Sequence, residues 1–128
     1  MKRLSFRTLV ATAALAASGA ALADVTIGVI APLTGPASGL GIPVGNHVKL
    51  WPKEIAGQKV NVIVMDDATD PTAAVKNVRM LISEDKVDAI LGPNLIGTAT
   101  AMADVANTEK VPMISVAPLD VAGDKRAF

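Results

Sequence analysis

Asp24-Val25-Thr26-Ile27-Gly28-Val29-Ile30-Ala31 is a nearly uncharged segment rich in β-branched residues, and Pro32 ends it. Such a segment is typical of a strand that is buried on both faces, as strands are in parallel sheets. Three similar segments follow, at residues 60–65, 87–91 and 111–116. Their recurrence along the chain predicts a sheet with four strands.

Segments with helical character separate these strands. One is expected at residues 42–55, where Pro52 should kink or shorten it because proline removes a backbone donor. A second follows Asp70, which suits an N-cap, with Pro71 as the first helical residue. A third is expected at residues 98–108. The second helix has apolar residues at helical spacing, at Ala74, Val75, Val78, Leu81 and Ile82.

The resulting order is β-α-β-α-β-α-β with short connections. It predicts a doubly wound α/β fold, in which a mostly parallel sheet has helices on both faces and right-handed crossovers. Such sheets bind ligands at the carboxyl ends of their strands, near the point where the strand order reverses. Four loops lie at those ends, at residues 32–41, 66–70, 92–97 and 116–120. Any function encoded in this part of the chain is expected there.

Residues 1–23 have the features of a secretory signal peptide. Three cationic residues precede an uncharged run of small and apolar residues at 8–20, and small residues precede a cleavage site after Ala23. A membrane anchor is the weaker interpretation, because the run is shorter than the ~20 apolar residues of a span. Cleavage leaves residues 24–128 with a formal charge of −3, since the three cations are lost.

The composition of the 128-residue chain excludes several classes of protein. It has no cysteine, which excludes thiol catalysis, zinc ribbons and a disulfide framework. Twelve basic and twelve acidic residues leave no general electrostatic footprint for nucleic acid, which is not expected as a partner. With two Phe, one Trp and no Tyr, the chain also lacks a platform for stacking bases.

Catalytic and cofactor motifs are either absent or in the wrong context. Residues 39–45 and Asp66 imitate a dinucleotide-binding fingerprint, but seven residues separate the first glycine from the strand that should lead into it. The chain has no P-loop or nucleophile elbow, and His47, its single histidine, cannot build a triad or a two-histidine metal site. Asp66, Asp67 and Asp70 are better explained as turn and capping residues than as cation ligands. We therefore expect no enzyme activity, cofactor or metal.

Four segments and one helix, in a fixed order, carry a family resemblance: IGVIAPLTG at 27–35, MDDATDP at 65–71, the helix at 75–82, VDAILGP at 87–93 and KVPMIS at 110–115. Together they resemble the N-terminal part of the type 1 periplasmic solute-binding proteins of ABC transporters, in the leucine/isoleucine/valine-binding-like family. The resemblance implies that residues 24–128, after a signal peptide at 1–23, form the N-terminal part of lobe I of a two-lobe solute-binding domain, with the second lobe absent.

In that family two α/β lobes close on a small ligand that bridges them. The resemblance implies a periplasmic, non-enzymatic component of an ABC importer, which binds amino acids or related small carboxylates and works with a membrane permease. An extracellular ligand-sensing domain of the same fold and a doubly wound enzyme are the alternatives. A single lobe is expected to bind ligand weakly or not at all, because the second lobe must bury the ligand's other face.

The resemblance also implies that hydroxyl and backbone N–H groups of the loops after the third and fourth strands hold a ligand carboxylate. Leu95-Ile96-Gly97 stands where amino-acid-binding members have a small hydroxyl residue, and Leu119 stands where they have Thr. These departures leave room for a more apolar or aromatic carboxylate. The candidate ligand-binding residues are Thr34, Asn94, Leu95, Ile96, Gly97, Thr98, Ser115, Ala117, Pro118 and Leu119.

Overall fold

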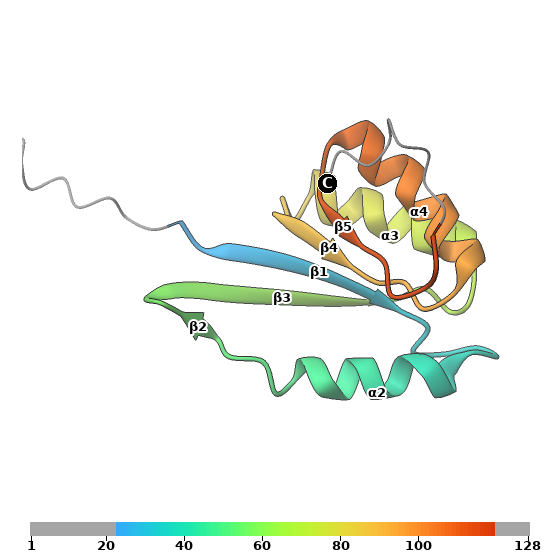
Figure 1. The fold of residues 1–128 in the computed structure, drawn as a ribbon, viewed down its shortest axis with the longest axis horizontal. Helices are drawn as coiled ribbons and strands as arrows, with labels where there is room; N and C mark the ends of the chain where they lie inside the picture. The colour runs from blue at the N-terminus through green and yellow to red at the C-terminus, as the bar shows by residue number, and fades with distance from the viewer. Residues whose placement is uncertain (1–22, 120–128) are drawn as a thin grey trace, which may run out of the picture.

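The computed structural model describes residues 23–119 (Figure 1). Residues 1–22 of the predicted signal peptide and residues 120–128 lie outside this range. None of the helices within it is long and apolar enough to cross a membrane. The elements in chain order are β1 (Val25–Ala31), α2 (Ser38–Val48), β2 (Glu54–Ile55), β3 (Gln58–Asp66), α3 (Pro71–Ser83), β4 (Ala89–Leu91), α4 (Ile96–Glu109) and β5 (Met113–Ile114).

The strands form one sheet in the order β2-β3-β1-β4-β5. All neighbouring strands are parallel except β2 and β3, which form an antiparallel hairpin. Helix α2 lies on one face of the sheet, and α3 and α4 lie on the other (Figure 1). The predicted doubly wound α/β fold is therefore confirmed, and β2 is an edge strand that the sequence did not predict.

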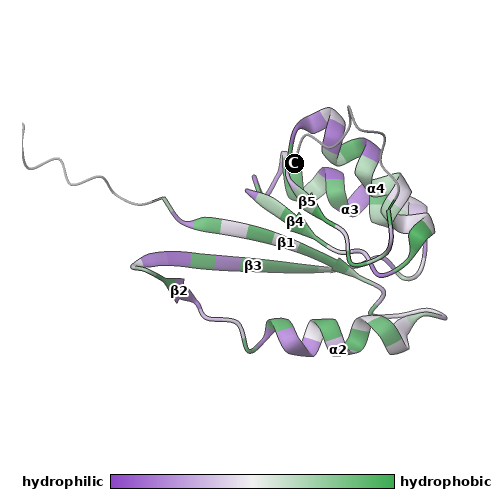
Figure 2. Ribbon diagram, in the orientation of Figure 1, coloured by the Kyte–Doolittle hydropathy of each residue, from purple (hydrophilic) through white to green (hydrophobic). Residues whose placement is uncertain are grey.

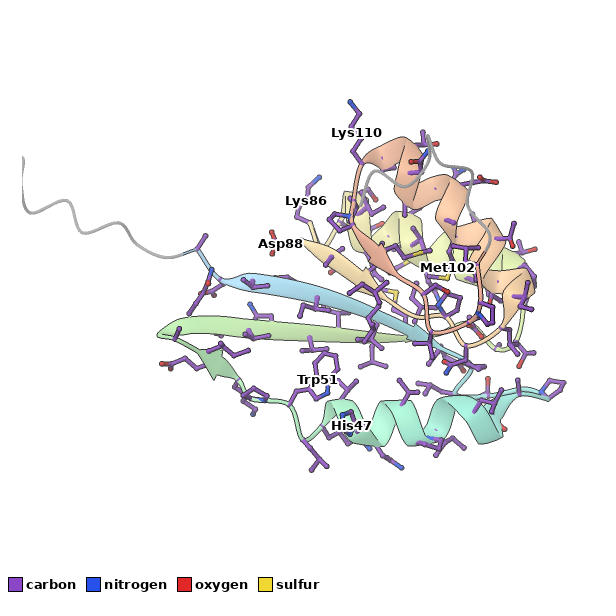
Figure 3. All side chains as sticks on the ribbon, in the orientation of Figure 1. His47, Trp51, Lys86, Asp88, Met102 and Lys110 are labelled. Carbon is purple, nitrogen blue, oxygen red and sulfur yellow. The ribbon has the colours of Figure 1, made fainter. Side chains whose placement is uncertain are left out.

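The core lies between the sheet and the helices α3 and α4. Ile30 of β1 and Ile90 of β4 point to this side and pack with Leu81 of α3. Met102 of α4 belongs to the same buried cluster and points toward it in Figure 3. A Cβ at Gly28 would lie 2.6 Å from Leu81 Cδ1, so glycine lets α3 approach the sheet closely.

The start of α3 follows the sequence prediction. Asp70 is the N-cap, and its Oδ1 atom accepts a hydrogen bond from the Thr72 N–H at 2.9 Å, while proline fills the first helical position. Ala74, Val78 and Leu81 of the predicted apolar stripe are fully buried. Local capping and helical periodicity therefore suffice to define this helix.

The predicted bounds of the first helix, 42–55, are wrong, because α2 spans Ser38–Val48. Gly41 explains the earlier start: a Cβ there would lie 2.1 Å from the Pro32 carbonyl oxygen, so glycine allows the helix to pack directly on the preceding loop. Ile55 lies beyond the helix, in β2, because the chain turns there into the β2–β3 hairpin.

The later elements also differ in their bounds from the prediction. β4 is shorter than 87–91 because Asp88 is turned toward β1: its N–H donates to the Thr26 carbonyl, and its Oδ2 atom accepts from the Thr26 N–H, both at 2.8 Å. β5 is shorter than 111–116, since Pro112 has no N–H for the ladder. Helix α4 begins at Ile96, two residues before the predicted start.

Candidate functional site

The strand order reverses between β1 and β4, at the carboxyl edge of the sheet. β1 leads into α2 on one face, whereas β4 leads into α4 on the other (Figure 1). In doubly wound sheets ligands bind at this switch point. The loops that border it are residues 32–37 after β1 and residues 92–95 after β4. The loops after β3 and β5, residues 67–70 and 115–119, flank them.

Asp66, the last residue of β3, organises the loop after β1. Its Oδ1 atom accepts hydrogen bonds from the backbone N–H groups of Leu33 (2.8 Å), Thr34 (3.1 Å) and Ala68 (2.8 Å). Its Oδ2 atom accepts a hydrogen bond from the Thr34 hydroxyl. One carboxylate therefore fixes two loops that lie far apart in the sequence.

Thr69 strengthens the connection between the same two loops. Its hydroxyl donates to the Thr34 carbonyl at 3.3 Å and accepts from the Ala37 N–H at 3.2 Å. Gly35, with a φ of 79°, approaches the Ala68 carbonyl so closely that a Cβ would lie 2.5 Å from its oxygen. The loops after β1 and β3 thus form one interlocked unit.

The interlock changes the acidity of Asp66. Partial desolvation of the carboxyl raises its pKa, but the hydrogen bonds from Thr34, Ala68 and Leu33 favour the charged form and together outweigh desolvation. The pKa of Asp66 consequently lies below its ordinary value. The folded loop is therefore more stable when Asp66 is ionised.

Asp67, the next residue, has the opposite environment. Its side chain is fully buried, its Oδ1 atom accepts from the Thr69 N–H at 2.8 Å, and its Oδ2 atom has no hydrogen-bond partner within residues 23–119. Burial raises the pKa of Asp67, and the nearby charges of Asp66 and Asp70 raise it further. The hydrogen bond from the Thr69 N–H lowers the pKa, but the other effects outweigh it. Within the described range no group of three or more His, Asp or Glu residues is arranged to hold a metal.

The loops after β4 and β5 are joined mainly through their backbones. The Ala117 N–H donates to the Pro93 carbonyl at 3.0 Å, and the Ser115 hydroxyl donates to the Ala117 carbonyl at 2.8 Å. Gly92, with a φ of 115°, lies so close to β1 that a Cβ would be 2.0 Å from the Ile30 oxygen. These contacts hold both loops against the end of β1.

Unsatisfied polar groups gather where β4 leads into α4. The N–H groups of residues 96–98 precede the first intrahelical bond, which runs from the Ala99 N–H to the Leu95 carbonyl at 2.9 Å. No side chain of the described chain caps this terminus. The Asn94 Oδ1 atom is buried and has no hydrogen-bond partner there. The junction therefore presents N–H donors, the positive end of a helix and one acceptor.

The ten sequence-predicted site residues fall into groups. Three have hydroxyls bonded within the protein: Thr34 to Asp66, Thr98 to the Leu95 carbonyl and Ser115 to the Ala117 carbonyl. Thr98 is only 1% exposed, and Ile96 is 61% exposed. Four residues form the β4–α4 junction: Asn94, Leu95, Ile96 and Gly97. The last three lie in the loop after β5, with Ala117 buried, Pro118 exposed and Leu119 half-buried.

Asp66 is the residue whose role the sequence reasoning missed, since it was interpreted only as a turn residue. The available signal was an acidic residue at a strand end, at the edge where ligands bind. Its partners Leu33 and Thr34 lie 33 and 32 residues upstream, so that no local pattern connects them with Asp66.

Comparison with known proteins gives a consistent result. The model of a family described as periplasmic binding protein matches residues 24–127. The Leu/Ile/Val-binding protein BraC3 of Rhizobium johnstonii is 35% identical over 120 residues, which are 88% of this chain and 32% of that protein. This chain thus spans about a third of the length of the curated relatives that it matches.

Solved structures show the same relation. An extracellular ligand-binding receptor from Rhodopseudomonas palustris HaA2 has a TM-score of 0.76 and 41% identity, over 80% of this chain and 29% of that one. A solute binding protein of an ABC transporter from Rhodopseudomonas palustris BisB5, in complex with 3,4-dihydroxy benzoic acid, has a TM-score of 0.69 and 35% identity, over 73% of this chain and 27% of that one.

Proposed function

Because the chain belongs to the periplasmic binding protein family, in its Leu/Ile/Val-binding-like group, we propose that it forms one side of the ligand site in the substrate-binding component of an ABC importer. The family binds solutes and is not a family of enzymes. The proposed ligand is a small carboxylate, and the proposed membrane partner is the importer's permease.

The unsatisfied polar groups at residues 94–98 are the observation that carries this proposal. A carboxylate at this junction would receive hydrogen bonds from the N–H groups of residues 96–98 and would lie at the positive end of α4. The buried Asn94 Oδ1 atom would accept a hydrogen bond from a ligand ammonium or hydroxyl group. The junction therefore suits a ligand that carries both an acid group and a donor.

Within this class we favour an apolar or aromatic carboxylate. Leu95 and Ile96 bring apolar side chains to the junction, where Ile96 is largely exposed, and Leu119 follows in the loop after β5. The dihydroxybenzoate complex of the 35% identical relative supports an aromatic acid, whereas the name of the 35% identical BraC3 protein supports a branched-chain amino acid. Both ligands have a carboxylate and a hydrogen-bond donor.

Binding in the complete site would need a second lobe. The carboxyl edge of one sheet contacts one side of a ligand, and a high-affinity pocket buries most of the ligand surface. This chain is therefore expected to bind such carboxylates only with a Kd of about 1 mM or weaker. Micromolar binding by this chain alone would contradict the shared-site part of the proposal.

The position of the site can be tested by NMR titration of the chain with 3,4-dihydroxybenzoate, leucine and isoleucine. We expect the amide signals of residues 96–98 to shift and those of the β2–β3 hairpin to stay unchanged. Gly97→Asp should abolish the shifts, because a carboxylate there repels the ligand. The variant should fold, since an added Cβ meets no atom within 4 Å and an acidic residue is favourable in the first turn of a helix.

Gly39→Asp is the matched control, because Gly39 also lies in the first turn of a helix with open space around it. It should leave the ligand-induced shifts intact. Unchanged amides at residues 96–98 with all three ligands at tens of millimolar would refute the proposed position.

Export is part of the same proposal. The sequence predicts cleavage after Ala23, and the family is periplasmic. N-terminal sequencing of the protein from a periplasmic fraction should give Asp24 as the first residue. Recovery of the chain with residues 1–23 intact would contradict cleavage.

A further inference from the structure

The predicted cleavage site lies directly before the first strand of the sheet. Cleavage after Ala23 breaks the peptide bond to Asp24, and β1 begins at the next residue, Val25. One extended residue spans at most about 3.6 Å, so this bond lies within one residue's length of the sheet. Ala23 and Asp24 are both exposed, and burial therefore gives the bond no protection.

β1 is an inner strand, with β3 on one side and β4 on the other. It is paired with β3 along its whole length, beginning with Val25 opposite Val60. Near its start, the Thr26 carbonyl accepts from the Asp88 N–H and the Thr26 N–H donates to Asp88 Oδ2, both at 2.8 Å. On the carboxyl side of the cleavage site the chain is therefore fixed from the second residue onward.

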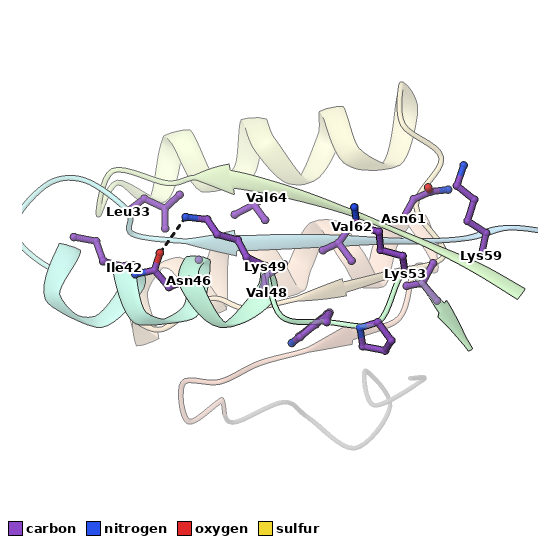
Figure 4. Close-up of a pocket in the computed structure, with 14 residues that line it drawn as sticks. Leu33, Ile42, Asn46, Val48, Lys49, Lys53, Lys59, Asn61, Val62 and Val64 are labelled. Carbon is purple, nitrogen blue, oxygen red and sulfur yellow. Dashed lines mark hydrogen bonds between the residues drawn. The ribbon is translucent and has the colours of Figure 1, made fainter. Parts of the chain in front are cut away.

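The first residues of β3 contact the two residues of the cleavage site. Gln58 donates a hydrogen bond from its Nε2 atom to the Ala23 carbonyl. The Nζ atom of Lys59 lies 3.8 Å from Oδ2 of Asp24, with both side chains more than half exposed, so this ion pair adds little by itself. Figure 2 shows hydrophilic residues at the start of β3 beside the largely hydrophobic β1, and Figure 4 shows Lys59 at this end of β3.

The Gln58 contact involves an atom on which peptide hydrolysis depends. Water attacks the Ala23 carbonyl carbon, the bond to the Asp24 nitrogen breaks, and the products are an Ala23 carboxylate and an Asp24 ammonium group. A peptidase donates hydrogen bonds to the carbonyl oxygen as it becomes negative. In the folded precursor Gln58 already donates to that oxygen. Because Ala23 departs with the signal peptide, this contact exists only before cleavage.

We propose that the folded chain closes its own signal-peptide cleavage site, so that residues 1–23 have to be removed before β1 enters the sheet. This inference rests on the proposed export and on cleavage after Ala23. Proteases cut segments of chain that are locally open. Here Gln58 holds one side of the bond and β1 holds the other, so a sufficient opening requires β1 to leave the sheet. A precursor that folds first therefore keeps its signal peptide.

The experiment follows cleavage of the full 128-residue precursor by purified signal peptidase in detergent micelles. In one arm the peptidase is present while the precursor is diluted out of urea. In the other it is added after the precursor has refolded, which circular dichroism monitors. Mass spectrometry measures the product that begins at Asp24. We expect cleavage after refolding to be at least about a hundredfold slower, because it then waits for an inner strand to open.

An insertion tests whether the distance to β1 is the cause. Six residues of alternating glycine and serine between Asp24 and Val25 provide about 20 Å of free chain. The refolded precursor with this insertion should be cleaved as fast as the unfolded one. The matched control has the same insertion between Glu84 and Asp85, two exposed residues that follow α3, and should stay protected.

A substitution tests the contact with the carbonyl. Gln58→Leu should speed cleavage of the refolded precursor by about two- to tenfold, because one hydrogen bond is removed while β1 stays in place. An unchanged rate would overturn the part given to Gln58.

Two results would overturn the whole inference and leave the proposed function in place. The first is an equal rate of cleavage in the two arms. The second is a refolded precursor that stays protected despite the insertion after Asp24, because the distance to β1 would then not be the cause. A precursor that is not cleaved after Ala23 even during dilution would instead overturn the predicted cleavage site, and this inference with it.

Discussion

Replacing Asp66 with Asn is expected to loosen the loop after β1 without disturbing the sheet. The carboxylate accepts three backbone N–H groups on Oδ1 and the Thr34 hydroxyl on Oδ2. Asparagine can keep the three N–H bonds on its carbonyl oxygen and turn its NH₂ group toward the Thr34 hydroxyl, which then has to accept. The geometry survives, but the negative charge is lost.

The size of the effect follows from these bonds. A hydrogen bond to a charged group contributes about 1.5–3 kcal/mol and a neutral one about 0.5–1.5 kcal/mol, so each of the three N–H bonds loses about 1 kcal/mol. Because the site is partly exposed, we expect Asp66→Asn to lower the free energy of unfolding by about 1–3 kcal/mol at pH 7. Asp70→Asn is the control, since Asn caps a helix about as well as Asp, and it should cost less than about 1 kcal/mol.

The effect should depend on pH in one direction. The pKa of Asp66 is lowered in the folded protein, so its stabilising contribution is complete above the ordinary value of 3.8 and is lost as the pH falls through the folded value. Asp66→Asn and the unmodified chain should therefore converge in stability at acid pH. Urea unfolding monitored by circular dichroism from pH 7 to 3 measures this difference. A difference below about 0.5 kcal/mol at pH 7, or one that persists unchanged to pH 3, would refute the role given to Asp66.

Two further predictions concern buried positions. Burial raises the pKa of Asp67, so its contribution to stability is present below the ordinary value and is lost as the pH rises through the folded value. The free energy of unfolding of Asp67→Asn, relative to that of the unmodified chain, should therefore increase from pH 4 to 7 in urea titrations. A decrease over this range would contradict a raised pKa for Asp67. Gly28→Ala should cost about 1–3 kcal/mol, because its Cβ would lie 2.6 Å from Leu81 Cδ1, and Leu81→Ala about 2–5 kcal/mol. The double variant should lose clearly less than the sum of the two, and strict additivity would show that the two residues do not press on each other.

Local sequence patterns predicted those parts of the fold that depend on local chemistry. The N-cap Asp70 and the stripe Ala74–Val78–Leu81 both follow from capping rules and helical periodicity. Helix α2 was misplaced because Gly41 has a tertiary role: it allows the helix to touch the Pro32 carbonyl, which no propensity scale records. Strand β4 was overestimated for a similar reason, since the side chain of Asp88 bonds the N–H of Thr26 in β1.

The sequence predicted which loops border the candidate site, but not the hydrogen bonds that their side chains make. The β-α order placed the functional groups at the carboxyl edge, where the switch point lies. The sequence could not show that the Thr98 and Ser115 hydroxyls are bonded to nearby carbonyls, because both residues are compatible with solvent-facing rotamers as well. Nor could it show that Asp66 meets Leu33 and Thr34, since only tertiary structure brings these residues together.

The distribution of satisfied and unsatisfied groups divides the carboxyl edge into two parts with different roles. In the loops after β1 and β3, Asp66 and Thr69 use the polar groups of Thr34, which leaves this part rigid but with few free donors. At the β4–α4 junction the N–H groups of residues 96–98 and the Asn94 Oδ1 atom have no such partners among the described residues. A ligand carboxylate therefore gains most from the second part, while the first part sets the shape against which the ligand lies. It follows that Thr34→Val should act on loop rigidity, and Gly97→Asp on the recognition of the carboxylate itself.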